Sequence, residues 1–191
     1  MTTPSMSLPR PVTLAGQAIT LRTLLPGDAE AMHAAIVESS PALSTTMLWW
    51  HEGFSLNETR DWAETCQSLW DQGQHYEFAI LSGPAEGYLG SCAMSGLNKQ
   101  QSKANLSYWV RTSQTGKGIA SQASRLVAQW AFRSLGVQRI EIVVVSTNLP
   151  SRGVALKAGA TQEGILRNGL WWNGRPYDAV VFSFIPEDFS L

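Results

Sequence analysis

Residues 108–121 read YWVRTSQTGKGIAS, and this segment is the most informative in the chain. Its first residues have the aromatic and β-branched character of a strand, and the apolar stripe of a long helix begins at Ile119. Between them, Gly116 and Gly118 let a ligand approach the backbone closely, and the first amides of a helix have no internal partner. Such amides and the helix dipole attract anions, and Lys117 adds a positive charge. The stretch therefore predicts a strand–turn–helix unit that binds a phosphate or pyrophosphate.

Two common nucleotide-binding motifs do not match here. A Walker loop requires glycine at position 111 and serine or threonine at position 118, where this chain has Arg111 and Gly118. The dinucleotide fingerprint requires glycine at position 121, where this chain has Ser121. The third candidate is the xxxGxG turn typical of acetyl-CoA enzymes, and Gly116 and Gly118 match its two glycines. An ordinary strand-to-helix turn that uses two glycines stays open as the alternative.

The rest of the chain predicts a mixed α/β sheet in a single domain. The expected strands cover, in order, residues 18–22, 75–81, 88–96, 103–111, 140–145, 163–167 and 177–184. The expected helices cover residues 26–38, the segment from the Ser55-x-x-Glu58 capping box to Gly73, residues 119–135 and residues 151–158. Residues 39–54 are expected to be irregular. We expect residues 1–11 to form a flexible N-terminal arm and residues 12–191 to form one domain.

Composition excludes several classes of protein. The chain has 191 residues and a net charge of −1, so charge gives no argument for a nucleic-acid or membrane partner. No apolar run approaches the length of a membrane span, and the first eleven residues do not resemble a signal peptide. The two cysteines, Cys66 and Cys92, lie outside any CxxC or Cys/His cluster. We therefore expect no disulfide and no metal site, and a cytoplasmic location.

Several segments together resemble the GNAT superfamily of N-acetyltransferases, and within it the Rim-type enzymes that modify the N-termini of ribosomal proteins. The similar segments are SYWVRTSQTGKGIASQA (107–123), LWW (48–50), ETR (58–60), NLPSRGVALKAG (148–159), EGILR (163–167) and NGRPYD (173–178). They follow the family's order over nearly the whole chain. The resemblance implies a predominantly antiparallel central sheet with helices on both faces.

The resemblance also implies roles in binding acetyl-CoA. The strand backbone at Trp109, Val110 and Arg111 would pair with the pantetheine arm, and Asn148 would hold that arm across a splay between two parallel strands. The pyrophosphate would bind to the amides of Gln114, Thr115, Gly116, Lys117, Gly118, Ile119 and Ala120. Ser151 would lie near the sulfur and protonate the leaving thiolate. From the residues alone, Asn148 is equally a turn residue and Ser151 a helix-capping or first-turn residue.

Aromatic residues are expected to line the acceptor pocket. The candidates are Trp49, Trp50, Trp171, Trp172 and Tyr177. Adjacent tryptophans on a strand cannot both point inward. The pairs can instead pack together to close the groove or form a dimer interface, and a homodimer through the C-terminal strands is left open.

Two carboxylates that relatives use as bases are missing. Many relatives have a glutamate at the position of Asn105, and Rim-type enzymes can have one at the position of Leu170. The remaining candidates, unranked, are Glu52, His51, Asp61, Glu141 and Tyr177. Alternatively, a chain of water molecules can carry the proton away from the acceptor amine, or the amine is already largely neutral and needs little help from a base. An α-amine has a pKa of about 7.7–8.0 and is largely neutral near neutral pH, whereas lysine has a pKa of about 10.4.

These observations favour acetyl-CoA-dependent acetylation of the N-terminal α-amine of a protein or peptide. A small-molecule amine acetyltransferase acting on polyamines, amino acids or antibiotics shares every coenzyme-binding feature and would be favoured by a very acidic acceptor groove. The two missing carboxylates also leave open a non-catalytic protein that binds acyl-CoA. A phosphate-binding protein without coenzyme A chemistry ranks last, because both nucleotide motifs fail.

Overall fold

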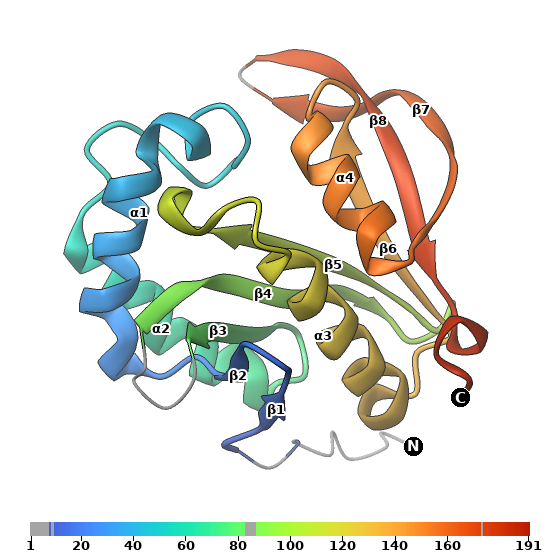
Figure 1. Ribbon diagram of the computed structural model, residues 1–191, viewed down its shortest axis with the longest axis horizontal. Helices are drawn as coiled ribbons and strands as arrows, with labels where there is room; N and C mark the ends of the chain where they lie inside the picture. Colours follow the sequence, from blue (N-terminus) through green and yellow to red (C-terminus); the bar gives the residue numbers. More distant parts are fainter. Residues whose placement is uncertain (1–7, 9, 83–86, 173) are drawn as a thin grey trace.

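A central eight-stranded sheet organises the molecule in the computed structural model, which describes residues 8, 10–82, 87–172 and 174–191 (Figure 1). The strands are β1 Thr13–Ala15, β2 Thr20–Thr23, β3 Tyr76–Ser82, β4 Gly87–Asn98, β5 Lys103–Val110, β6 Arg139–Val145, β7 Thr161–Trp172 and β8 Arg175–Phe184. Their order across the sheet is β1-β2-β3-β4-β5-β6-β8-β7. Only β5 and β6 pair in parallel among these strands. The predicted mixed, predominantly antiparallel α/β fold is confirmed.

Four α-helices cover the two faces of the sheet. They are α1 Ala29–Leu43, α2 Leu56–Asp71, α3 Ile119–Leu135 and α4 Leu149–Ala158, joined by the short 3-10 helices η1 Pro26–Asp28, η3 Thr112–Gln114 and η4 Pro186–Phe189. One buried cluster packs α3 and α4 against the sheet, and a second packs α1 and α2 against the end of the sheet formed by β3, β4 and β5. The chain passes from β5 through η3 into α3, and from β6 into α4 (Figure 1).

Local sequence explains where the helices begin and end. Ser55 caps α2, since its hydroxyl accepts from the Glu58 amide while the Glu58 carboxylate accepts from the Ser55 amide. The apolar stripe of α3 lies on the sheet, with Val127 and Trp130 buried. Gly136 ends α3 with φ of 66°, in the left-handed region. These predicted signals are all confirmed.

The parallel pair β5–β6 separates after a short contact. Its register runs from Lys103 opposite Arg139 to Asn105 opposite Glu141 and then stops. Beyond Asn105, the edge of β5 that faces β6 has no partner strand among the described residues. Unpaired backbone groups on that edge are available to a ligand. The splay therefore opens a site in the middle of the sheet.

The structure corrects two sequence expectations. The three-residue strand β1 was missed, because it is too short and too exposed to show a pattern. Residues 39–43 were expected to be irregular, but α1 continues through Leu43 despite Pro41. The buried side chains of Ser39 and Leu43 hold this last turn against the core, which outweighs the hydrogen bond that proline removes.

Most of the predicted N-terminal arm, residues 1–7 and 9, lies outside the described residues. Where the chain is described, the carbonyl of Leu8 accepts from Trp70 Nε1 at 3.4 Å, and Arg10 forms an ion pair with Asp71 at 2.8 Å. Both partners lie at the end of α2. Leu8 and Arg10 therefore contact the domain.

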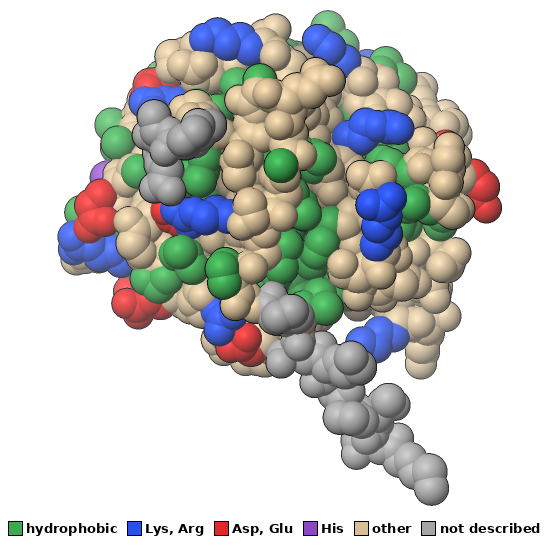
Figure 2. Space-filling model, turned by 60° about the horizontal axis from the view of Figure 1, so that its bottom comes forward, with side chains coloured by type: hydrophobic (Ala, Val, Ile, Leu, Met, Phe, Trp, Pro, Cys, Tyr) green, Lys and Arg blue, Asp and Glu red, His purple; other side chains and the backbone are tan. Residues whose placement is uncertain are grey.

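The surface shows no concentration of positive charge on the face drawn in Figure 2, where Lys and Arg side chains are scattered among apolar and polar ones. This distribution agrees with the small net charge of −1. Within the described part of the chain, no helix is both long enough and apolar enough to span a bilayer.

Candidate active site

A tight turn connects the end of β5 to the start of α3. Gly116 and Gly118 both have φ of 78°, which strongly favours glycine. A Cβ at Gly116 would meet no described atom within 4 Å, so the backbone there faces open space. Among the described residues, no side chain caps α3 and its first turn holds no acid. The turn therefore offers free N–H groups and positive potential to an anionic ligand.

A cavity of about 830 Å³, called the donor cavity below, lies between this turn, the end of α1 and the start of α4. Most residues expected to bind the coenzyme line it: Trp109, Val110, Gln114, Thr115, Gly116, Gly118, Ile119, Ala120 and Asn148. Arg111 and Lys117 do not line it. Arg111 forms an ion pair with Glu38 of α1, and Lys117 Nζ donates to Gln114 Oε1 at 2.8 Å. The size and the free amides of the cavity fit a ligand that carries a pyrophosphate.

Lys157 of α4 lines the donor cavity beside Gly118 and was not singled out from the sequence. Its position depends on how α4 packs on α3, which no local pattern reveals. Lys157 therefore places a positive charge beside the glycine turn.

Asn148 and Ser151 occupy the first turn of α4. Asn148 is the N-cap, and its Oδ1 accepts a hydrogen bond from the Ser151 amide at 3.1 Å. The capping role that the sequence left open for Asn148 is therefore present. Both residues also line the donor cavity and the second cavity described below.

Tyr108 of β5 lies against Ser151. Its hydroxyl donates to the Ser151 carbonyl at 2.9 Å and lies 3.2 Å from Ser151 Oγ. Burial raises the pKa of Tyr108 to about 12, against a smaller opposing effect of the hydrogen bond to Ser151, so the phenol stays protonated at neutral pH. Tyr108 lines both cavities too. Two hydroxyl groups therefore lie where the cavities meet.

The second cavity, called the acceptor cavity below, has a volume of about 730 Å³ and lies between the α1–α2 connection, the splayed strands and β7. Trp49 and Trp172 line it, as expected. Trp50 instead packs against the core under α1 and α2, and Trp171 is 69% exposed. Tyr177 lies beside Trp172, with ring centroids 5.6 Å apart, and is not in the wall. Each tryptophan pair thus places one ring in the cavity wall, as the alternation of a strand requires for Trp171 and Trp172.

Apolar side chains form most of the wall of the acceptor cavity. They include Met47, Leu48, Phe54, Trp62, Leu166 and Leu170. Among the described residues, the acids in the wall are Glu58 and Glu77. The acceptor cavity is therefore largely apolar rather than strongly acidic.

The bases considered from the sequence are not in this wall: Glu52, His51, Asp61, Glu141 and Tyr177 lie elsewhere. Glu141 pairs with Arg139 at 2.9 Å and with Lys103 at 3.6 Å. His51 bonds to Glu58 at 2.7 Å, and its pKa is raised first by the Glu52 carbonyl and then by Glu58. The side chains of Glu141 and His51 therefore form structural ion pairs and hydrogen bonds outside the wall of the acceptor cavity.

Glu58 lines the cavity but is held by the helix cap. Hydrogen bonds from the Ser55 hydroxyl and amide, together with His51, lower the pKa of Glu58 to about 2. A carboxylate with so low a pKa is a weak base.

Sequence reasoning missed Glu77, although one signal was available. The strand segment YEFAIL (76–81) has a single acid among apolar residues. An acid buried inside an apolar strand is uncommon without a partner or a function.

Comparison with known proteins agrees with this arrangement. The acetyltransferase (GNAT) domain family matches residues 18–161. YdaF of Bacillus subtilis (strain 168), named provisionally as a ribosomal N-acetyltransferase, is 30% identical over 178 residues, which are 90% of this chain and 93% of YdaF.

Solved structures extend the comparison to the fold. A Vibrio cholerae protein, described provisionally as a ribosomal-protein-serine acetyltransferase, superposes with a TM-score of 0.77 at 26% identity and covers 92% of this chain and 98% of its own. RimL, the ribosomal L7/L12 alpha-N-protein acetyltransferase, has been solved in complex with coenzyme A. It superposes with a TM-score of 0.82 at 22% identity and covers 91% of this chain and 98% of its own, a likeness of fold.

Proposed function

The chain belongs to the GNAT acetyltransferase family, and we propose that it transfers an acetyl group from acetyl-CoA to the N-terminal α-amine of a protein or peptide. It is an acyltransferase, and GNAT acetyltransferases use acetyl-CoA as the acyl donor. The proposal treats residues 12–191 as one acetyltransferase domain. Two free buried cysteines, Cys66 and Cys92, suit work in a reducing cytoplasm.

The donor cavity is proposed to hold acetyl-CoA. The amides that follow Gly116 and Gly118 would bind the pyrophosphate, with Lys157 as the nearby cation. The free edge of β5 beyond Asn105 would pair with the pantetheine arm as an added strand. Asn148 would hold that arm from the other side of the splay.

Ser151 and Tyr108 are proposed to act on the leaving sulfur. The acyl donor supplies a thioester carbonyl for the amine to attack and a thiolate that must gain a proton. The two hydroxyl groups lie at the junction of the donor and acceptor cavities, and Tyr108 is held protonated. One of them would give its proton to the thiolate and recover it from solvent.

The apolar, aromatic wall of the acceptor cavity is the main support for a peptide α-amine as the acceptor. Polyamines and aminoglycosides carry several positive charges, and a site for them needs several acids. Here the described wall has two acids, of which Glu58 is already paired with His51. Trp49 and Trp172 offer faces that can hold a peptide backbone or its side chains.

Thiol release from acetyl-CoA tests this function with three acceptor pools. One pool contains peptides with free Ser or Ala termini and no lysine, another contains terminus-blocked lysine peptides, and the third contains polyamines and aminoglycosides. We expect turnover in the first pool. Turnover confined to the other pools would reject the proposed acceptor and keep the enzyme class.

A non-catalytic acyl-CoA-binding protein predicts tight acetyl-CoA binding with no turnover in any pool. Background from Cys66 and Cys92 is subtracted with a sample that lacks acceptor.

A further inference from the structure

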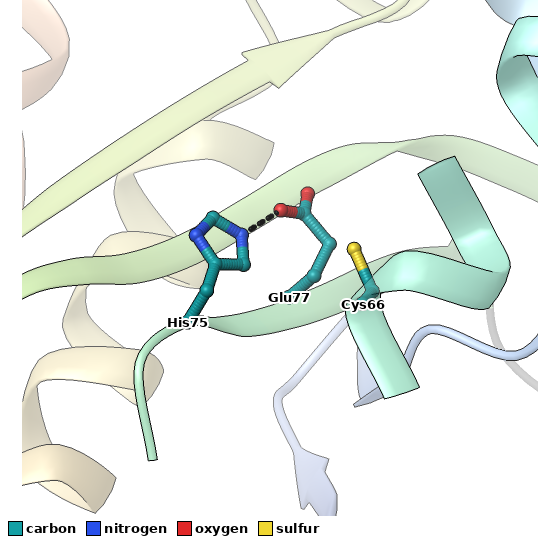
Figure 3. A group of neighbouring side chains, drawn as sticks. All are labelled: Cys66, His75 and Glu77. Carbon is teal, nitrogen blue, oxygen red and sulfur yellow. Dashed lines mark hydrogen bonds and ion pairs between the residues drawn. The ribbon is translucent and has the colours of Figure 1, made fainter. Parts of the chain in front are cut away.

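A buried carboxylate, Glu77 of β3, lies in the wall of the acceptor cavity. It is 6% exposed and shares that wall with His75. His75 Nε2 donates to Glu77 Oε2 at 2.6 Å, and Figure 3 shows both side chains coming from the same stretch of chain. Within the described residues, no other side chain or amide donates to this carboxylate. Its second oxygen, Oε1, is therefore available to a ligand in the cavity.

The sheet register places Glu77 on the face of the sheet that Ser107 of β5 also shares. Glu77 is opposite Ala93 of β4, and Ala93 is opposite Ser107 of β5. Side chains in such a row point to one face, which Asn105 and Trp109 share because residues alternate along β5. With two strand spacings between them, the Cα atoms of Glu77 and Ser107 are roughly 10 Å apart. Glu77, Asn105, Ser107 and Trp109 all line the acceptor cavity.

The carboxylates of Glu77 and Glu58 differ in how many hydrogen-bond donors already occupy them. The Glu58 carboxylate is occupied by the Ser55 cap and by His51. Glu77 has one structural partner and one open oxygen. A buried carboxylate with an unfilled acceptor site gains from a cationic donor, and an ammonium group is such a donor.

Cys66 of α2 is the third member of this cluster (Figure 3). One potential ligand atom from each of Cys66, His75 and Glu77 lies within 4.8 Å of the others. Burial, and then the charge on Glu77, raise the pKa of the Cys66 thiol well above its usual range, so the thiol stays protonated.

We propose that Glu77 is the catalytic base of this transferase and that His75 positions its carboxylate. Glu77 Oε1 takes one proton from the acceptor ammonium, and the freed nitrogen lone pair attacks the thioester carbonyl. The C–S bond breaks as the C–N bond forms, and the thiolate takes its proton from the hydroxyl pair at Tyr108 and Ser151. The amide nitrogen loses its remaining surplus proton to solvent. The inference rests on the proposed function, because it assumes that the amine enters the acceptor cavity.

Four titratable groups near Glu77 keep their charge over a neutral to mildly alkaline range. Cys66 of α2 and Tyr88 and Cys92 of β4 all respond to the charge on Glu77, and burial raises the pKa of each. Glu58 of α2 has a pKa lowered to about 2 and stays ionised. His75 contacts Glu77 directly, and its contribution is tested by substitution.

The experiment compares kcat and KM of wild type, Glu77→Gln, His75→Gln and Glu163→Gln at pH 6.5 and pH 9, with a Ser-terminal peptide that has no lysine. Glu163→Gln is the matched control, because Glu163 is a strand carboxylate on β7 outside both cavities. Acetyl-CoA affinity is measured for each variant and reports whether the variant folds.

For Glu77→Gln we expect kcat/KM to fall about 100-fold or more at pH 6.5, the scale of general base catalysis. At pH 9 the deficit shrinks to roughly tenfold or less, since an α-amine with a pKa near 7.7–8.0 is already neutral. His75→Gln keeps a donor to the carboxylate and loses much less at either pH. Glu163→Gln stays within about twofold of wild type, on the scale expected for a substitution outside the site.

An equal loss at both pH values, or no loss at pH 6.5, overturns the role of Glu77. A His75→Gln variant as impaired as Glu77→Gln also overturns it, because the imidazole would then be the base. If Glu77→Gln fails to bind acetyl-CoA, Glu77→Asp replaces it. Glu77→Asp must keep the wild-type pH profile at reduced kcat, and a loss of that profile contradicts the proposal.

Failure of this inference is distinct from failure of the proposed function. If wild type acetylates lysine peptides or polyamines instead, the acceptor is wrong, and the same variants are measured on that amine with pH values that bracket its pKa. If wild type acetylates the Ser-terminal peptide and Glu77→Gln equals it, only the role of Glu77 is wrong.

Discussion

The Tyr108 hydroxyl donates to the main-chain carbonyl of Ser151 at 2.9 Å and joins β5 to the first turn of α4 across the splay. This contact spans the junction of the donor and acceptor cavities. It fixes the distance between the strand proposed to bind the pantetheine arm and the helix that presents Ser151. It also places a protonated phenol 3.2 Å from the Ser151 hydroxyl.

Replacing Tyr108 with phenylalanine should lower kcat by about 100-fold, the lower end for loss of a general acid. The ring remains to fill the core, so acetyl-CoA affinity should change little, and the lost hydrogen bond should cost about 1 kcal/mol of unfolding free energy. Steady-state kinetics and thermal melts measure the two effects. Ser151→Ala is the companion variant. Wild-type kcat in both variants would remove the hydroxyl pair from the reaction.

Gly118→Ala should weaken acetyl-CoA binding. The N-cap of α3 has φ of 78°, and an L-residue there is strained by about 1–2 kcal/mol. A relaxed turn would redirect the amides that are proposed to hold the pyrophosphate. Calorimetric titration measures the affinity, and Gly27→Ala is the control, since a Cβ at Gly27 meets nothing within 4 Å among the described atoms and its φ is not positive. Equal affinities in the two variants would place the pyrophosphate elsewhere.

The neighbours Trp171 and Trp172 provide a matched pair on one strand. Trp172 lines both cavities, whereas Trp171 points to solvent. Trp172→Ala should raise the KM for a peptide acceptor roughly tenfold, because an aromatic anchor is worth more than 1 kcal/mol. Trp171→Ala should leave KM nearly unchanged. The reverse ranking would show that the peptide binds on the outer surface of the β7–β8 hairpin.

Acid should destabilise the contact between α1 and the coenzyme turn. The Arg111 side chain, followed by Ser113, lowers the pKa of Glu38 to about 2 from an ordinary value near 4.5. Because the folded state holds this carboxylate ionised, its stabilising effect is complete above about pH 4.5 and is lost as the pH falls towards 2. Thermal melts from pH 6 to pH 3 should show a smaller decline for Glu38→Gln than for wild type. Parallel curves would mean that the pair contributes nothing measurable.

Features set by neighbouring residues could be predicted from the sequence. The Ser55 cap, the α3 stripe and the glycine turn before α3 depend on spacing within a few residues. The approach of Lys157 to Gly118 depends instead on the packing of α4 against α3. Lys117, the cation adjacent in sequence, turns away to Gln114.

The wall of the acceptor cavity was less predictable from the sequence, because it also depends on contacts between residues that are distant in the chain. Glu77 and Ser107 are separated by a whole strand and meet on one face only through the β3–β4–β5 register. The missing acid at Asn105 and the single acid in the strand YEFAIL were both visible in the sequence, but the position of Glu77 two strands away from β5 was not. The role of each tryptophan in a pair also required the structure, because alternation says that one ring points inward without saying which.

The most direct test of the central claim locates the transferred acetyl group. Purified protein and isotope-labelled acetyl-CoA are incubated with a peptide that has both a free Ser terminus and one lysine, and fragment-ion mass spectrometry assigns the label. We predict label on the α-amine and none on the lysine ε-amine. Label on lysine, or no label despite saturable acetyl-CoA binding, would contradict it.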